Sequence, residues 1–324
     1  HIATTGRPGP VLIDFPMDIL KTVYDEDGTE EINLRGYKLP GKANESQVRK
    51  VAQALKKAKK PVILAGGGIC ISGAVDCVRE LVYKTDIPVV ATMMGLGVIP
   101  SDDKNYYGMI GSHGRKAANV ILNRSDLVIA LGTRLGDRTI ANAPGFEKAN
   151  KLIHIDIDPA EIGKNVDVDL PIVGDAKNIL NSLNDLFKGY KVTNDVNSWT
   201  DKIKQRKVDL LPRVTYDDVP LKPQTVIKEI SEVLTPESIL TTDVGQNQMW
   251  AAHFYDTQRP RKFISSGGLG TMGFGFPSAI GAKVACPDDP VVSINGDGGF
   301  LMVCQELATV REYDIPVIAV VLEN

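Results

Sequence analysis

The sequence predicts an α/β protein whose domains are built on parallel sheets. Short apolar, β-branched runs end in Gly or Asp, and a helical pattern follows each of them. Strands of a parallel sheet give such continuous apolar runs because helices cover both faces of the sheet. At roughly 150 residues per domain, the 324 residues indicate two domains.

Strands and helices alternate along the chain. The predicted strands are residues 10–15, 61–66, 88–92, 127–132, 151–156, 238–243, 290–296 and 316–324. Between them, amphipathic stretches carry Lys, Arg or Glu along one face, as solvent-facing helices do. These predicted helices are residues 46–58, 72–84, 114–123, 223–234 and 303–313.

This alternation divides the chain into four parts. Residues 1–40 hold one strand-like run and a charged tail, as expected for the end of an upstream domain and its linker. Residues 41–188 form a middle domain, and residues 221–324 form a second domain. The polar residues 189–220 connect the two and are predicted to be partly helical at 197–209. Because the chain starts at His1 and stops directly after an apolar run, we expect a fragment of a longer protein.

Composition excludes several classes of protein. The net charge is −3 and 43% of the residues are hydrophobic, which argues against disorder, nucleic-acid binding and a polybasic membrane surface. No apolar run reaches the about 18 residues that a membrane span needs. The four cysteines show neither a CxxC pair nor zinc-site spacing, so we expect reduced cysteines and a reducing compartment such as the cytoplasm.

The segment INGDGGF (294–300) is the strongest local sign of chemistry. An apolar strand delivers Asp297 between Gly296 and Gly298, where a carboxylate can hold Mg²⁺ and glycines let the backbone approach a phosphate. Asn324 ends the next apolar run, and a right-handed crossover through 303–313 makes the two strands neighbours. Asp297 and Asn324 can therefore converge on one ion, although many Asp-Gly pairs are simple turns.

Two further glycine-rich segments suggest anion binding. Gly66, Gly67 and Gly68 follow a strand and can present backbone N–H groups to an anion, or form a bare tight turn. Arg134 and Arg138 follow a strand end and can bind a diphosphate, or be solvated. The GxGxxG pattern in SGGLGTMGFG lacks an acidic residue at a strand end about 20 residues on, so no nicotinamide site is expected there.

Taken together, the motifs resemble one family. GDG followed by Asn324 is similar to the thiamine-diphosphate signature, with Glu323 where that family has the first Asn of a pair. Eight segments resemble acetohydroxyacid synthase (acetolactate synthase) large subunits: GRPGPVLIDFP (6–16), MMGLGVIP (93–100), GMIGSHG (108–114), GTRLGDR (132–138), HIDIDPAEIGKN (154–165), DVGQNQMW (243–250), SGGLGTMGFGFPSAIGA (266–282) and GDGGFLMVCQELATVRE (296–312).

The resemblance implies a Rossmann-like middle domain that binds FAD and a partial domain that binds thiamine diphosphate. The implied thiamine-diphosphate residues are Val244, Gly245, Gln246, Asn247, Gly270, Met272, Gly296, Gly298 and Gly299, and Met272 supports the bent shape of the cofactor. The implied FAD residues are Arg7, Gly66, Gly67, Gly68, Thr92, Met93, Ile110, Gly111, His113, Gly132, Thr133, Arg134, Arg138, Asp156, Ile157, Asp175 and Ala176. Asp297 and Asn324 are the implied ligands of Mg²⁺.

The resemblance also implies a reaction. Pyruvate is decarboxylated on thiamine diphosphate, and the two-carbon unit passes to a second 2-keto acid, pyruvate or 2-ketobutyrate, in branched-chain amino-acid biosynthesis. The family implies a homodimer or homotetramer and a possible regulatory subunit. Its activating glutamate belongs to an upstream domain, so we expect no catalytic residue in this chain and no activity from the chain alone. The alternatives are an FAD-independent catabolic acetolactate synthase, a pyruvate-oxidase-like enzyme, or a non-catalytic nucleotide-binding module.

Overall fold

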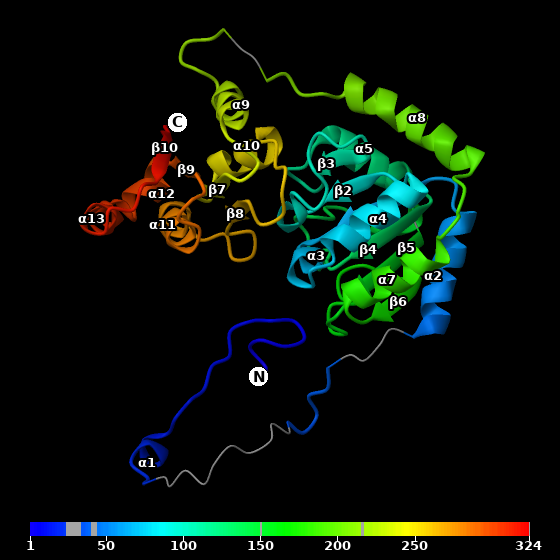
Figure 1. The fold of residues 1–324 in the computed structure, drawn as a ribbon, viewed down its shortest axis with the longest axis horizontal. Coiled ribbons are helices and arrows are strands. Elements are labelled where there is room, and N and C mark those ends of the chain that lie inside the picture. The colour runs from blue at the N-terminus through cyan, green and yellow to red at the C-terminus, as the bar shows by residue number, and fades with distance from the viewer. Residues whose placement is uncertain (24–33, 40–43, 150, 215–216, 324) are drawn as a thin grey trace.

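The chain forms two α/β units, each built on a parallel sheet (Figure 1). The computed structural model describes residues 1–23, 34–39, 44–149, 151–214 and 217–323. The predicted fold class, parallel-sheet α/β domains, is confirmed. No helix in these ranges is long and apolar enough to cross a membrane. All four cysteines are free thiols.

The middle unit has six parallel strands in the order β3-β2-β1-β4-β5-β6. The strands are β1 (Pro61–Ala65), β2 (Val89–Ala91), β3 (Tyr106–Met109), β4 (Leu127–Leu131), β5 (Lys151–Asp156) and β6 (Leu170–Val173). The helices are α2 (Glu45–Lys57), α3 (Gly67–Ile71), α4 (Val75–Thr85), η1 (Met93–Gly95), α5 (Lys116–Arg124), α6 (Ala143–Ala149), α7 (Ala176–Leu186) and α8 (Asn194–Asp209).

Helices cover both faces of this sheet, as the continuous apolar runs predict. Ile63 and Ile129 pack in one core cluster with residues of α2, α4 and α7. Val62 and Val128, one position earlier in each strand, pack in a second cluster with residues of α5, α6 and α8. Side chains alternate between the two faces of a strand, so a strand between two helical layers needs apolar residues at every position.

The C-terminal unit has four parallel strands in the order β10-β9-β7-β8. The strands are β7 (Ile239–Thr242), β8 (Phe263–Ser265), β9 (Val291–Gly296) and β10 (Ile318–Leu322). The helices are α9 (Pro223–Val233), α10 (Gln246–Phe254), α11 (Gly275–Ala285), α12 (Asp297–Leu301), η2 (Cys304–Glu306) and α13 (Leu307–Glu312). As the crossover rule predicts, β9 and β10 are neighbours, and Leu322 pairs with Gly296.

The structure corrects one predicted strand and adds three. Residues 10–15 form no strand; they are exposed, with Leu12 at 92%, and lead into the short helix α1 (Met17–Leu20) away from both units (Figure 1). An apolar run becomes a strand only beside a hydrogen-bonding partner, and no described residue pairs with this one. The sequence pattern missed β3, β6 and β8 because a glycine, a proline or a serine interrupts or ends the apolar residues of each strand: YYGM, LPIV and FIS.

The predicted connection at residues 189–220 contains the 16-residue helix α8. Its Trp199 and Ile203 are buried in the same cluster as Val128 of β4. The helical half of the connection therefore packs on the middle unit.

Candidate functional site

A cavity of about 1330 Å³ lies between the two units. Residues that follow β1, β2, β4 and β5 line one wall, among them Gly67, Thr92 and Thr133. Residues that follow β7 and β8, such as Gly245 and Ser266, line the opposite wall. In the middle unit the strand order reverses between β1 and β4, and ligands of open parallel sheets bind at such a switch point.

Glycines meet at this switch point. The N–H groups of Gly66 and Gly68 donate to the carbonyls of Leu131 and Gly132, both at 2.9 Å. A Cβ atom on Gly68 would lie 2.7 Å from the Cα of Gly132, and Gly132 has a φ of +54°. The glycine run therefore joins the ends of β1 and β4, and two of its three N–H groups are already bonded within the protein.

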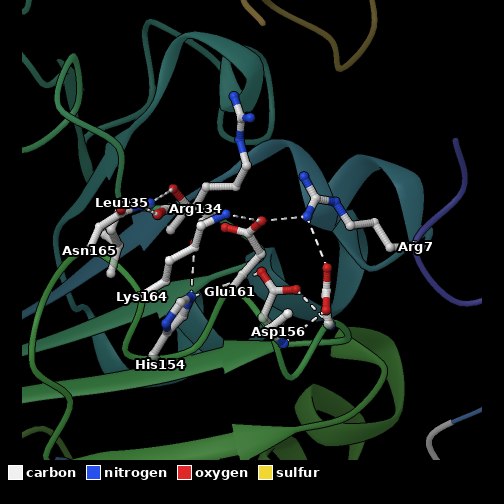
Figure 2. Close-up of polar contacts among 11 residues, drawn as sticks. Arg7, Arg134, Leu135, His154, Asp156, Glu161, Lys164 and Asn165 are labelled. Atoms are coloured by element: carbon white, nitrogen blue, oxygen red, sulfur yellow. Dashed lines mark hydrogen bonds and ion pairs between the residues drawn. The ribbon is translucent and has the colours of Figure 1, made fainter.

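Arg7 is held at the edge of the cavity by two carboxylates, although it is far away in the sequence (Figure 2). Its Nη1 lies 2.9 Å from Oδ2 of Asp158 and 2.7 Å from Oε1 of Glu161. Lys164 Nζ approaches the same Glu161 oxygen at 3.3 Å. Burial acts to raise the pKa of Glu161, but the bonds from Arg7 and Lys164 hold that pKa below its ordinary value. The carboxylates thus fix a cation at the cavity edge.

His154 and Asp156 lie beneath this ion-pair group at the end of β5 (Figure 2). His154 is fully buried, and its Nε2–H donates to the carbonyl of Thr133 at 2.8 Å. Burial lowers the pKa of His154 and raises the pKa of Asp156. His154 is therefore a neutral structural residue, whereas Asp156 also lines the cavity.

Most of the residues that the resemblance assigned to FAD line this one cavity. They are Arg7, Gly67, Gly68, Thr92, Met93, Ile110, His113, Gly132, Thr133, Arg134, Arg138, Asp156, Ile157, Asp175 and Ala176. Gly66 and Gly111 are outside the lining. Arg134 and Arg138 are exposed; Asn165 Nδ2 donates to the Arg134 carbonyl at 2.8 Å, and the Arg134 side chain extends away from the ion-pair group (Figure 2).

Asp243, directly after β7, organises the second wall, although no sequence motif assigned it a role. Its carboxylate accepts hydrogen bonds from the N–H groups of Val244 at 2.7 Å, Gly273 at 3.1 Å and Gly275 at 3.0 Å. The residue is fully buried, and a Cβ atom on Gly299 would collide with its carboxylate. An aspartate directly after the apolar run SILTT was the available signal.

The residues assigned to thiamine diphosphate divide between the cavity and the GDG turn. Val244, Gly245 and Gly270 line the cavity, whereas Gln246, Asn247, Met272, Gly296, Gly298 and Gly299 are outside its lining. Asn247 is buried, and its Nδ2 donates to the Ile294 carbonyl at 3.0 Å. A Cβ atom on Gly298 would lie 3.6 Å from Cε of the half-exposed Met272. Met272 therefore lies beside the GDG turn.

Asp297 is exposed at the first position of α12, directly after β9. Because Leu322 pairs with Gly296, the chain leaves β10 at the same edge of the sheet. Asn324, the second predicted ligand, is outside the described residues. Within the described ranges, no group of three or more His, Cys, Asp or Glu residues could hold a metal ion. The magnesium site at Asp297 and Asn324 stays a prediction.

Comparison with known proteins assigns both units. Residues 48–183 match the central domain of thiamine pyrophosphate (thiamine diphosphate) enzymes, and residues 243–324 match their C-terminal TPP-binding domain. The chain belongs to the thiamine pyrophosphate enzymes. The predicted resemblance is confirmed.

Three similar relatives are described as acetolactate synthase large subunits or probable ones. The chain is 48% identical to a probable acetolactate synthase large subunit of Methanococcus aeolicus and 49% identical to one of Methanocaldococcus jannaschii. It is 40% identical to the acetolactate synthase large subunit of Haemophilus influenzae. Each alignment covers 100% of this chain but only 56–57% of the relative. The chain thus spans just over half the length of these relatives.

Proposed function

We propose that the complete protein containing this chain is an acetolactate synthase. It would decarboxylate pyruvate and transfer the two-carbon unit to a second 2-keto acid, pyruvate or 2-ketobutyrate, for branched-chain amino-acid biosynthesis. The observation that carries the proposal is that acetolactate synthase large subunits align with every residue of the chain at 40% identity or more. This chain would supply the middle domain and part of the cofactor domain.

The cavity has the properties of an FAD site. It lies at the switch point of a parallel sheet, and closely packed glycines keep side chains out of the crevice there. Arg7, Arg134 and Arg138 supply cations that suit a diphosphate, and the carboxylate of Asp156 suits ribose hydroxyl groups. These residues, with the others that line the middle-domain wall, would hold FAD.

The end of β7 and the GDG turn suit thiamine diphosphate. When bound, thiamine diphosphate supplies the carbanion that adds to a keto acid and stabilises its decarboxylation. Asp243 prearranges the backbone around Val244 and Gly273, and Gly296 and Gly298 leave room for a phosphate, while Gly299 makes room for the Asp243 carboxylate itself. Asp297 would hold Mg²⁺ with Asn324, since oxygen ligands suit this ion.

The complete protein would also assemble with other chains. Two of the relatives above are described as probable large subunits and the third as a large subunit, which supports a separate small, regulatory subunit here. A homodimer or homotetramer of the large subunit belongs to the same proposal.

The test is to purify the complete protein and assay it with pyruvate, thiamine diphosphate and Mg²⁺. We expect acetolactate formation, acetohydroxybutyrate when 2-ketobutyrate is added, and release of FAD on denaturation. Release of carbon dioxide from pyruvate without formation of acetolactate or acetohydroxybutyrate would refute the proposed synthase activity. Full synthase activity in a protein that contains no flavin would refute the FAD site and favour the FAD-independent synthases.

The magnesium assignment is tested by Asp297→Ala in the complete protein. Mg²⁺-dependent binding of thiamine diphosphate should weaken at least tenfold, because the carboxylate is one of two proposed protein side-chain ligands. Binding of thiamine diphosphate is measured by fluorescence quenching. Unchanged Mg²⁺-dependent binding in the variant would contradict the assignment.

A further inference from the structure

The two units are joined at the cavity by a reciprocal pair of contacts. From the middle unit, Nε and Nη2 of Arg115 donate to the backbone carbonyl of His253, at 3.1 and 2.6 Å. From the C-terminal unit, Nε2–H of His253 donates to the backbone carbonyl of His113. Each unit thus gives one side chain to the backbone of the other, where α10 contacts β3 (Figure 1).

The local structure is adapted to the Arg115 contact. Gly108 of β3 has a φ of +109°, and a Cβ atom there would lie 2.6 Å from Cδ of Arg115. Glycine at this position therefore leaves the path of the arginine open. The carbonyl of His253 belongs to the last turn of α10, where carbonyl groups lack helical partners and the helix dipole favours a cation.

The His253 contact acts on a loop of the cavity wall. His113 lines the cavity, whereas His253 and Arg115 are outside its lining. The same loop is fixed from the middle unit, since Gly111 exchanges hydrogen bonds with the side chain of Asn119 at 3.0 and 2.9 Å. His253 adds a contact from the other unit. The geometry of this wall therefore depends on how α10 is docked.

The His253 ring needs only a neutral N–H to make this contact. Burial lowers the pKa of His253, although the hydrogen bond to the His113 carbonyl acts in the opposite direction. Arg115 and His113 nearby lower it further. A neutral amide with a similar reach, such as glutamine, can replace the donor.

We propose that His253 is a positioning residue of the cavity: it holds the His113 loop against the C-terminal unit and so couples flavin binding to the docking of the two units. The proposal rests on the FAD site proposed above. His253 contacts no ligand itself; it acts through the backbone of His113.

The test compares His253→Leu, which removes the donor, with His253→Gln, which keeps one. A third variant, Ser101→Ala, is the matched control, because Ser101 Oγ donates to the Thr257 carbonyl at 3.1 Å between the same two units and neither residue lines the cavity. FAD is titrated into flavin-free complete protein, and the Kd is read from flavin fluorescence. The melting temperature without FAD reports on folding.

We expect His253→Leu to raise the Kd for FAD about tenfold, as the loss of one hydrogen bond between the two units predicts. His253→Gln and Ser101→Ala should stay within about twofold of the wild type. Wild-type affinity in His253→Leu would overturn the proposal. So would an equal loss in the glutamine or the Ser101 variant, which would assign the effect to general packing. Failure of the FAD site itself is distinguishable, because the wild-type protein would then bind no flavin.

Discussion

The central strand β1 and the edge strand β10 have similar sequences but different surroundings. Both are five-residue runs of apolar residues, PVILA and IAVVL, and both pair in parallel. All five residues of β1 are buried between two helical layers, whereas Ile318 of β10 is 59% exposed. The apolar pattern therefore predicts a strand, but the burial of that strand depends on its neighbours. Residues 10–15 extend the comparison, since that apolar run lacks even a strand partner among the described residues.

The largest expected effect tests this difference directly. Ile63→Ala, in β1, should lower the free energy of unfolding by about 3–4 kcal/mol, because the side chain is fully buried and a cavity remains. Ile318→Ala, the matched change in β10, should cost less than about 1 kcal/mol, because the side chain is exposed. Urea denaturation of this chain measures both. Equal costs would mean that exposure does not distinguish the two strands.

A second prediction separates the packed and open parts of the C-terminal unit. Gly275 and Gly281 are both in α11, but a Cβ atom on Gly275 would lie 2.5 Å from the backbone N of Asp243, whereas Gly281 has open space. Gly275→Ala should lower the free energy of unfolding by about 2 kcal/mol, because the added methyl group overpacks the site. Gly281→Ala should raise it by up to about 1 kcal/mol, because alanine has the higher helix propensity. Thermal unfolding measures the melting temperature of both variants. A shift of both melting temperatures in the same direction would contradict this interpretation.

The smallest expected effect is a pH dependence of folding stability that originates at His154, in the buried part of β5. Burial lowers the pKa of His154 from its ordinary value of 6.5, so the unfolded chain binds a proton first as the pH falls below 6.5. The contribution of neutral His154 to stability should therefore be fully present above this pH. The free energy of unfolding should decrease by about 1 kcal/mol as the pH falls from 7 to 5.5.

The matched variant for this pH effect is His154→Asn, which removes the titrating group. His253 titrates in the same direction, so the slope in the variant should shrink without vanishing. Urea midpoints at pH 7 and 5.5 give the slope. An unchanged slope would exclude His154 as a source of the acid sensitivity.

Much of the fold and of the site could be predicted from the sequence. Seven of the eight predicted apolar runs contain strands, because central strands need apolar residues at every position. The motifs indicated the family, and most residues assigned to FAD line one cavity. The strands β3, β6 and β8 were missed because a glycine, a proline or a serine interrupts or ends each of their apolar runs.

Two residues of the site were beyond the sequence pattern. Asp243 is important because three N–H groups from two loops converge on its carboxylate, and His253 because its ring reaches a carbonyl 140 residues away. Asp243 offered only its place directly after the apolar run SILTT, and the His253 contact has no periodic or local signature.

By itself the sequence determined the central strands of both sheets and the family of enzyme to which the chain belongs, because these depend on local patterns and motifs. Only the tertiary structure decided which apolar runs are buried, that the two units share one cavity, and that His253 and Arg115 join its walls. These features depend on contacts between residues far apart in the chain, and the energy of such contacts is set by packing and burial rather than by local sequence.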